Sequence, residues 1–260
     1  MTPDDLDLNT AAQLLRDSGW GVIPPDQYLK DMDKEFLSIW NHVRPYTLIS
    51  PERGWAFTEA IRHVCRKNIP GDIVECGVYK GGACLLASYI LASQSNSDRR
   101  NIWLYDTFTG MVEPGDDDRI ASSGQSLKDR HPEGWWAAGV DDVKKNLKTS
   151  PLEKHRFRFV PGRVEDTLLN EIPDKISVLR LDTDWFESTM MELNVLYPRL
   201  SEGGVLIIDD YGHFTGARKA VDDFFQDRGE KVLLHRSDYT GRVIVKDGKP
   251  GDVDIPISNS

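Results

Sequence analysis

Short runs rich in β-branched residues alternate with longer amphipathic stretches from residue 72 onward. This alternation is typical of βαβ units, in which parallel strands form a sheet and helices cover its faces. The expected strands are DIVEC (72–76), NIWLYD (101–106), RFRFV (156–160), ISVLRLD (176–182), GVLIIDD (204–210), KVLLH (231–235) and RVIVK (242–246). One expected helix begins near Gly82, and four others cover 139–148, 164–170, 187–200 and 215–228. The pattern therefore predicts an α/β fold.

The last connection between strands differs from the others. Its segment, HRSDYTGR (235–242), is rich in turn residues and too short for a crossover helix. The last two strands should therefore pair as an antiparallel hairpin. We expect a seven-stranded, mostly parallel, Rossmann-like sheet with an antiparallel last strand.

Helical periodicity also marks three segments before the first strand, at 10–18, 33–43 and 51–67. A chain of 260 residues is long enough for one large α/β domain and short for two independent ones. We expect a single structural domain with three parts: an N-terminal helical cap (1–70), the sheet domain (71–250) and a C-terminal tail (251–260).

Residues 107–138 form a connection far longer than the usual few residues between a strand and a helix. The connection contains Gly, Pro, Asp and Ser, and it carries the adjacent pair Trp135 and Trp136. Connections of this length often cover a site as lids.

Charge and composition exclude several kinds of function. The net charge of −10 argues against a nucleic-acid partner, because phosphate binding depends on clustered Lys and Arg. The acidic N-terminus lacks the order of a secretory signal, and no run approaches the length needed to cross a bilayer. A cytoplasmic protein without a membrane partner is expected. Cys65, Cys76 and Cys84 form no CxxC pair, so neither a disulfide framework nor a zinc site is expected.

The first strand ends in a glycine-rich turn, Glu75-Cys76-Gly77-Val78-Tyr79-Lys80-Gly81-Gly82. Ligands of open α/β sheets bind beyond the carboxyl ends of the strands, where glycines let the backbone approach a ligand closely. The spacing is not GxGxxG, and a carboxylate here would repel an anionic dinucleotide. S-adenosylmethionine, which carries a sulfonium and an ammonium, fits better. The cofactor-binding candidates are Glu75, Gly77, Val78, Tyr79 and Gly81, and a glycine turn without a ligand is the alternative.

Two further strand ends carry weaker cofactor signals. Asp106 ends the second strand, where a carboxylate could accept hydrogen bonds from both ribose hydroxyls of a nucleoside. That role also suits NAD, and a solvated loop aspartate is the alternative. After the third strand, Gly162 and Val164 could flank an adenine or simply begin a helix.

Four aspartates follow two neighbouring strands, because the fourth strand ends in LRLDTDW and the fifth in LIIDDYG. Asp182, Asp184, Asp209 and Asp210 should therefore meet at one edge of the sheet. Carboxylates this close repel one another, which makes a hard cation such as Mg²⁺, Mn²⁺ or Ca²⁺ their natural partner. The alternative is that Asp209 and Asp210 cap the next helix while the others meet solvent or Arg180.

These acidic stretches carry a family resemblance. LRLDTDWFEST, followed by LYPRLSEGGVLIIDDYGHFTGARKAVDDFF, resembles the macrocin O-methyltransferase family, as do VECGVYKGG and LYDTFTGM. The resemblance runs from about Val74 to Val245. It implies a class I methyltransferase fold and transfer of a methyl group from S-adenosylmethionine to a sugar hydroxyl of a macrolide or related natural product. Together with the apolar N-terminal region it also implies a homo-oligomer, either a dimer or a larger assembly.

The resemblance further implies residue roles. Asp182, Asp209 and Asp210 would hold Mg²⁺, Asp182 would also border the cofactor, and Asp184 would be the general base. Catechol-type methyltransferases have a similar metal triad and use a lysine near the first aspartate as the base. Residues 182–189 contain no lysine, so the role falls to Asp184 or to His213. A histidine with only a structural role is the alternative for His213.

Other functions remain open from the sequence. A metal-dependent hydrolase would use the same aspartates to activate water, although it would not need the acidic, glycine-rich strand end. A non-catalytic protein that retains the fold is a further alternative, because a fold alone does not establish an activity. The acceptor could also be a different polyol or glycan.

Overall fold

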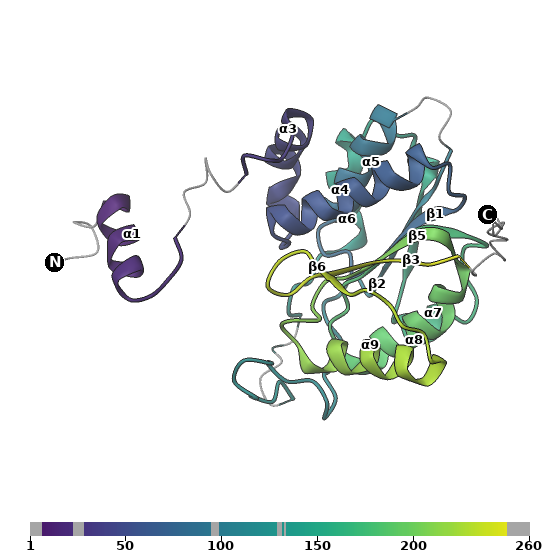
Figure 1. Cartoon of the computed structure of the whole chain (residues 1–260). Coiled ribbons are helices and arrows are strands. Elements are labelled where there is room, and N and C mark those ends of the chain that lie inside the picture. The colour runs from purple at the N-terminus through teal and green to yellow at the C-terminus, as the bar shows by residue number, and fades with distance from the viewer. Residues whose placement is uncertain (1–6, 23–28, 95–98, 129–131, 133, 249–260) are drawn as a thin grey trace, which may run out of the picture. The chain divides into compact units, whose positions relative to one another are not determined.

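A seven-stranded sheet organises the computed structural model (Figure 1). The strand order is β3-β2-β1-β4-β5-β7-β6. The strands are β1 (Asp72–Cys76), β2 (Ile102–Asp106), β3 (Phe157–Pro161), β4 (Ile176–Leu181), β5 (Leu200–Ile208), β6 (His235–Arg236) and β7 (Arg242–Val245). The first five strands are parallel, and β7 runs antiparallel to both β5 and β6. The expected mostly parallel sheet and terminal hairpin are confirmed.

The sixth strand is shorter than the sequence predicts. Residues 231–234 are not in a strand, and only His235 and Arg236 pair with β7. This strand lies at the edge of the sheet, where it has one neighbour instead of two. Leu233 is 82% exposed, whereas Val232 and Leu234 pack against the core, so the side chains of this segment are partly buried without the backbone pairing of a strand. The expectation of a strand over 231–234 was wrong.

The structure describes residues 7–22, 29–94, 99–128, 132 and 134–248, and the expected tail (251–260) lies outside these residues. The chain divides into two units, residues 1–37 and 38–260. The expected cap boundary at residue 70 does not coincide with this division. Helix α1 (Leu8–Asp17) belongs to the first unit, and its N-cap Asp7 accepts hydrogen bonds from two backbone N–H groups.

The helices of the second unit form two layers on the sheet (Figure 1). One face is covered by α4 (Pro51–Arg66), α5 (Gly82–Gln94) and α6 (Val140–Asn146), and the other by α7 (Val164–Thr167), α8 (Phe186–Leu196) and α9 (Thr215–Arg228). Helix α3 (Lys34–Val43) crosses the boundary between the units. Short 3₁₀ turns cover Arg44–Tyr46, Leu147–Thr149, Lys154–Arg156 and Tyr197–Arg199. Within the described residues, no helix is both long and apolar enough to cross a membrane.

Local sequence explains where several helices begin and end. Ser50 caps α4 by accepting a hydrogen bond from the N–H of Arg53, and Pro51 occupies the first helical position. Helix α8 ends at Leu196, earlier than predicted, and the chain continues as the 3₁₀ turn Tyr197–Arg199, because Pro198 has no N–H to continue the α-helical hydrogen bonds. Gly229 ends α9 with φ of 65°, in the left-handed conformation that glycine adopts without strain.

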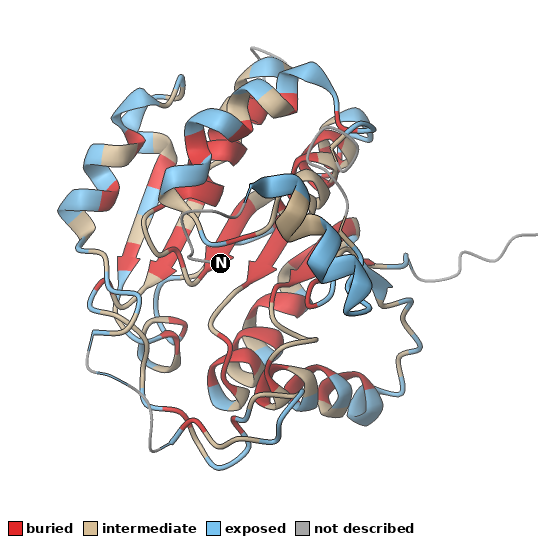
Figure 2. Cartoon of the chain, turned by 90° about the vertical axis from the view of Figure 1, so that its left-hand side faces the viewer, coloured by how far each residue is buried: buried red, intermediate tan, exposed pale blue. Residues whose placement is uncertain are grey.

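The core lies on both faces of the central strands (Figure 2). Every residue of β4 is buried, as expected for a parallel strand with helices on each side. The packing of these strands therefore fixes their carboxyl ends and, with them, the positions of the residues that follow.

The described part of the 107–138 connection is tied to the start of α8. The carboxylate of Asp118, which is 1% exposed, accepts a hydrogen bond from the backbone N–H of Phe186 at 2.9 Å. The indole N–H of Trp185 donates to the carbonyl of Val112 at 2.9 Å. The connection is thus anchored directly beside the aspartates that follow β4.

Replacing Asp118 with Ala should destabilise the protein by about 1–3 kcal/mol, because it removes a buried carboxylate that accepts hydrogen bonds from the N–H groups of Phe186 and Gly115. Urea unfolding would measure the change. Asp116→Ala is the matched control, since Asp116 lies on the same connection, is exposed and pairs with Lys128. Equal stability of the two variants would contradict the anchoring role of Asp118.

Candidate active site

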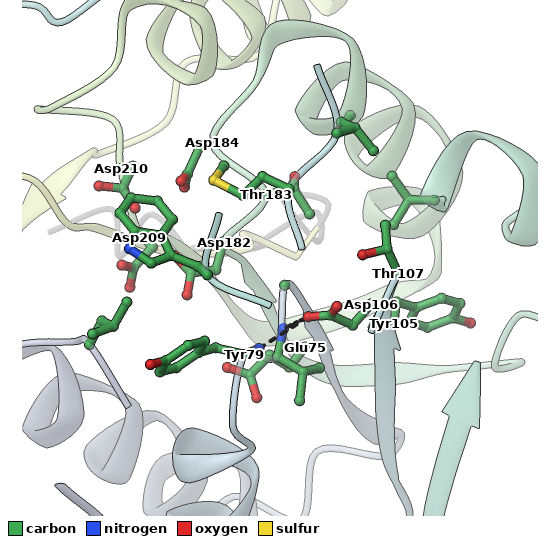
Figure 3. Close-up of a pocket in the computed structure, with 18 of the residues that line it drawn as sticks. Glu75, Tyr79, Tyr105, Asp106, Thr107, Asp182, Thr183, Asp184, Asp209 and Asp210 are labelled. Atoms are coloured by element: carbon green, nitrogen blue, oxygen red, sulfur yellow. Dashed lines mark hydrogen bonds between the residues drawn. The ribbon is translucent and has the colours of Figure 1, made fainter. Parts of the chain in front are cut away.

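One pocket lies beyond the carboxyl ends of the parallel strands, and Figure 3 shows many of its residues. It brings together nearly all of the residues that the sequence singled out. Those lining it are Glu75, Gly77, Val78, Tyr79, Asp106, Gly162, Val164, Asp182, Asp184, Asp209, Asp210 and His213. Gly81 is not among the lining residues. Gly81 has φ of 83°, and its N–H donates to the carbonyl of Val78. It therefore shapes the turn without facing the pocket.

The glycine turn brings the ends of β1 and β4 unusually close. Gly77 has φ of 82°, and a Cβ at this position would clash with the carbonyl oxygen of Asp182. The N–H of Asp182 donates to the carbonyl of Cys76 at 2.8 Å. Only glycine permits this approach. It joins the expected cofactor turn to Asp182, the first of the four aspartates (Asp182, Asp184, Asp209 and Asp210) that we call the acidic group.

Asp106 holds the turn from the end of β2. Its Oδ2 accepts hydrogen bonds from the N–H groups of Val78 at 2.6 Å and Tyr79 at 3.0 Å, while Oδ1 accepts one from Phe108 at 2.7 Å. Burial raises the pKa of this carboxyl, and the three backbone donors oppose the rise. Asp106 therefore orders the backbone of the pocket, and a ribose contact stays a prediction.

A buried arginine connects the two halves of the pocket. Arg180, which is 1% exposed, donates to Glu75 Oε1 at 2.5 Å and to Asp182 Oδ2 at 2.9 Å, and its other nitrogen pairs with Asp209 Oδ1. Cys84 Sγ lies 2.7 Å from the second carboxylate oxygen of Glu75. Burial raises the pKa of Glu75, and the charge of Arg180 opposes that rise.

Three of the four aspartates form a tight group. Ligand atoms of Asp182, Asp184 and Asp210 all lie within 4.8 Å of one another. Burial, followed by repulsion from the neighbouring carboxylates, raises the pKa of Asp184 well above its usual range. Among the described residues, Asp184 Oδ1 is buried and has no hydrogen-bond partner. Figure 3 places the aspartates on one side of the pocket and Asp106 on the other.

Asp209 has a different environment from the other three. It is 1% exposed, and its two carboxylate oxygens pair with Arg53 and Arg180. Burial alone would raise the pKa of Asp209, but the two guanidinium groups lower it below its usual value. The division of the aspartates into Asp182, Asp209 and Asp210 for metal and Asp184 for proton removal stays a prediction.

The turn between β6 and β7 also lines the pocket, which the sequence did not indicate. Asp238 accepts a hydrogen bond from Ser50 Oγ at 2.8 Å, and its Oδ2 lies 3.1 Å from Arg53 Nε. The next residue, Tyr239, places its hydroxyl 3.4 Å from Nδ1 of His213. Arg53 and Tyr239 were missed because each is far in sequence from the residues that it meets.

The sheet order, the terminal hairpin and the pocket define a protein class. The structure of the O-methyltransferase NovP matches with a TM-score of 0.71 and 28% identity, covering 93% of this chain and all of that one. The crystal structure of the calicheamicin methyltransferase CalS11 shares the fold, with a TM-score of 0.60 and 16% identity, covering 94% of this chain and 98% of that one. The fold is that of class I S-adenosylmethionine-dependent O-methyltransferases.

Sequence comparison places the chain within this class. The profile of the macrocin O-methyltransferase (TylF) family matches residues 33–246. Demethyldecarbamoylnovobiocin O-methyltransferase from Streptomyces niveus is 35% identical over 179 residues, which are 69% of this chain and 67% of that protein. Mycinamicin III 3''-O-methyltransferase from Micromonospora griseorubida is 33% identical over 179 residues, covering 69% and 70% of the two chains. The chain belongs to the macrocin O-methyltransferase family.

The acidic group predicts a stability that depends on both pH and divalent cations. The pKa values of Asp182, Asp184 and Asp210 are raised by burial and mutual repulsion, so the folded protein binds their protons more tightly than the unfolded chain does. The resulting stability is present below the ordinary pKa of aspartate and is lost as the pH rises through the raised values. In chelator, the melting temperature should fall between about pH 5 and pH 8.

Added Mg²⁺ should reverse most of that fall, because a cation favours the charged carboxylates. Thermal melts at both pH values, with chelator or with Mg²⁺, would test this. An equal effect of Mg²⁺ at the two pH values would contradict a cation site built from these groups. Asp184→Asn should weaken the pH dependence, since it removes one of the titrating carboxyls.

Proposed function

We propose that this protein transfers a methyl group from S-adenosylmethionine to a sugar hydroxyl of a small natural-product glycoside, with assistance from Mg²⁺. The observation that carries the proposal is the meeting of the glycine turn and the acidic group in one pocket. Membership of the macrocin O-methyltransferase family supports methyl transfer. The names of the relatives refer to acceptors related to novobiocin and to mycinamicin, which supports an acceptor of the same general kind.

The pocket suits a cofactor with net positive character. Carboxylates face it from the ends of β1, β2, β4 and β5. The arginines that line it, Arg53 and Arg163, are already paired with acids, and so is the buried Arg180 next to the acidic group. An anionic dinucleotide would meet this field unfavourably. Asp106 lines the same pocket as Glu75 and the glycine turn, so ribose hydroxyls of the cofactor would find carboxylate oxygens there.

The acidic group suits a hard divalent cation. It offers only carboxylate oxygens, which favour Mg²⁺ over zinc, and Asp184 Oδ1 is a buried acceptor that lacks a partner among the described residues. Asp182, Asp209 and Asp210 would hold the ion. When bound, Mg²⁺ would lower the pKa of an acceptor hydroxyl and fix its direction.

Asp184 is the proposed base. It is 6% exposed and has φ of 69°, a strained backbone conformation that points to a functional position. In the reaction, the acceptor oxygen forms a bond to the methyl carbon, the electrons of the carbon–sulfur bond stay on sulfur, and Asp184 takes the hydroxyl proton. Burial raises the pKa of its carboxyl, which favours uptake of the proton.

His213 and Tyr239 lie on the same wall of the pocket and are placed to contact the acceptor. His213 is the alternative base. The hydrolase reading loses support, since the relatives and structures described above are methyltransferases. The homo-oligomer expected from the sequence stays a prediction.

The proposal predicts that S-adenosylhomocysteine binds the purified protein and that turnover of a glycoside acceptor requires a divalent cation. Calorimetry would measure the binding of S-adenosylhomocysteine. Assays of methyl transfer in chelator, with and without added Mg²⁺, would measure the cation requirement. Absence of S-adenosylhomocysteine binding, with or without Mg²⁺, would contradict methyl transfer. Full activity in excess chelator would contradict the role of the metal while leaving methyl transfer intact.

A pair of variants separates the base from the metal ligands. Asp184→Asn should lower kcat by about 10²–10⁴-fold, the usual contribution of a general base, while Mg²⁺ affinity is largely retained. Asp209→Asn should weaken Mg²⁺ binding instead. Glu187→Gln, an exposed neighbouring carboxylate, is the control and should change neither quantity. Loss of Mg²⁺ affinity in Asp184→Asn but not in Asp209→Asn would make Asp182, Asp184 and Asp210 the metal ligands.

A further inference from the structure

Asp209 is the one proposed metal ligand whose oxygens are both already paired with cations. Its Oδ2 pairs with Arg53 and its Oδ1 with Arg180. It is also the one aspartate of the four outside the group whose ligand atoms lie within 4.8 Å of one another. A divalent cation at Asp209 would therefore have to compete with a guanidinium group for the same carboxylate.

The two arginines are not equally exchangeable. Arg180 is 1% exposed near the carboxyl end of the fully buried strand β4, and it also pairs with Glu75 and Asp182. Moving it would take this cation away from the buried carboxylates of Glu75 and Asp209 and from the half-buried Asp182, which is strongly unfavourable. Arg180 is therefore fixed.

Arg53 has the opposite properties. It extends from the first turn of α4, its side chain is 12% exposed, and it lines the pocket. Its Nε lies 3.1 Å from Asp238 Oδ2, so the guanidinium has a second acidic partner in the β6–β7 turn. Leaving Asp209 would not leave Arg53 without a countercharge.

We propose that Arg53 is a positioning residue that competes with the divalent cation for Asp209, and that cation binding leaves Arg53 paired with Asp238 alone. This inference rests on the proposed function, because it requires a cation at the acidic group. Arg53 holds the buried Asp209 carboxylate in place and, through its positive charge, weakens cation binding. Because the same arginine pairs with the turn that carries Tyr239, the metal site and the acceptor side of the pocket are linked through it.

The test measures Mg²⁺ affinity by calorimetry in the absence of methyl donor and acceptor. Arg53→Met should bind Mg²⁺ about tenfold more tightly than the wild type, because the competing charge near the site is gone. Arg53→Lys, which keeps the charge, should remain close to the wild type. Arg66→Met is the matched control, since Arg66 lies on the same helix, is exposed and is paired with Glu59, and it should have no effect. Unchanged or weaker affinity in Arg53→Met would overturn the inference.

A measurement on the unaltered protein keeps the inference testable if Arg53→Met does not fold. In ¹⁵N NMR spectra of the arginine Nε–H groups, Mg²⁺ should shift the signal of Arg53, assigned with Arg53→Lys, more than that of Arg180. A shift confined to Arg180 would overturn the inference that Arg53 leaves Asp209 when the cation binds. Wild-type protein that binds no Mg²⁺ at all would refute the proposed metal site, whereas wild-type binding with no change in Arg53→Met would refute only the competition.

Discussion

The charge of the buried Arg180 side chain is the constraint on which the pocket depends. In the sheet register Glu75 lies beside Arg180 on the neighbouring strand, and Asp182 follows two residues later on the same face. Asp209 follows Ile207, the partner of Arg180 on the other side, at the same interval. Three carboxylates from three strands therefore converge on one guanidinium. Without that countercharge, their desolvation would oppose the fold.

This arrangement joins the glycine turn after β1 to the acidic group. Gly77 and Asp182 touch through their backbones, and Asp106 ties the same turn to β2. The side of the pocket that we propose contacts the acceptor is built differently, from the described part of the 107–138 connection and the β6–β7 turn, which are anchored by Asp118 and Asp238. A pocket with strand ends at its centre and loops around its rim is consistent with a family in which one chemistry serves different acceptors.

Local pattern was sufficient for most of the fold because strands buried on both faces read as continuous apolar runs. It failed at 231–234, where β-branched and apolar residues lie at an exposed edge and pairing, not composition, decides the structure. The candidate residues met in one pocket because each follows a parallel strand, and parallel strands bring their carboxyl ends to one edge. Gly81 was the exception, since it shapes the turn without lining the pocket.

The sequence by itself determined the α/β class, the terminal hairpin and the gathering of four aspartates, because periodicity and strand direction are local properties. Tertiary structure alone decided that Asp209 differs from its neighbours and that Arg53 and Tyr239 belong to the pocket. Arg53 and Asp209 are 156 residues apart, and Ser50 and Asp238 are 188 apart. No periodic pattern records a contact at such separations, since it depends on how the packed helices and turns approach one another in space.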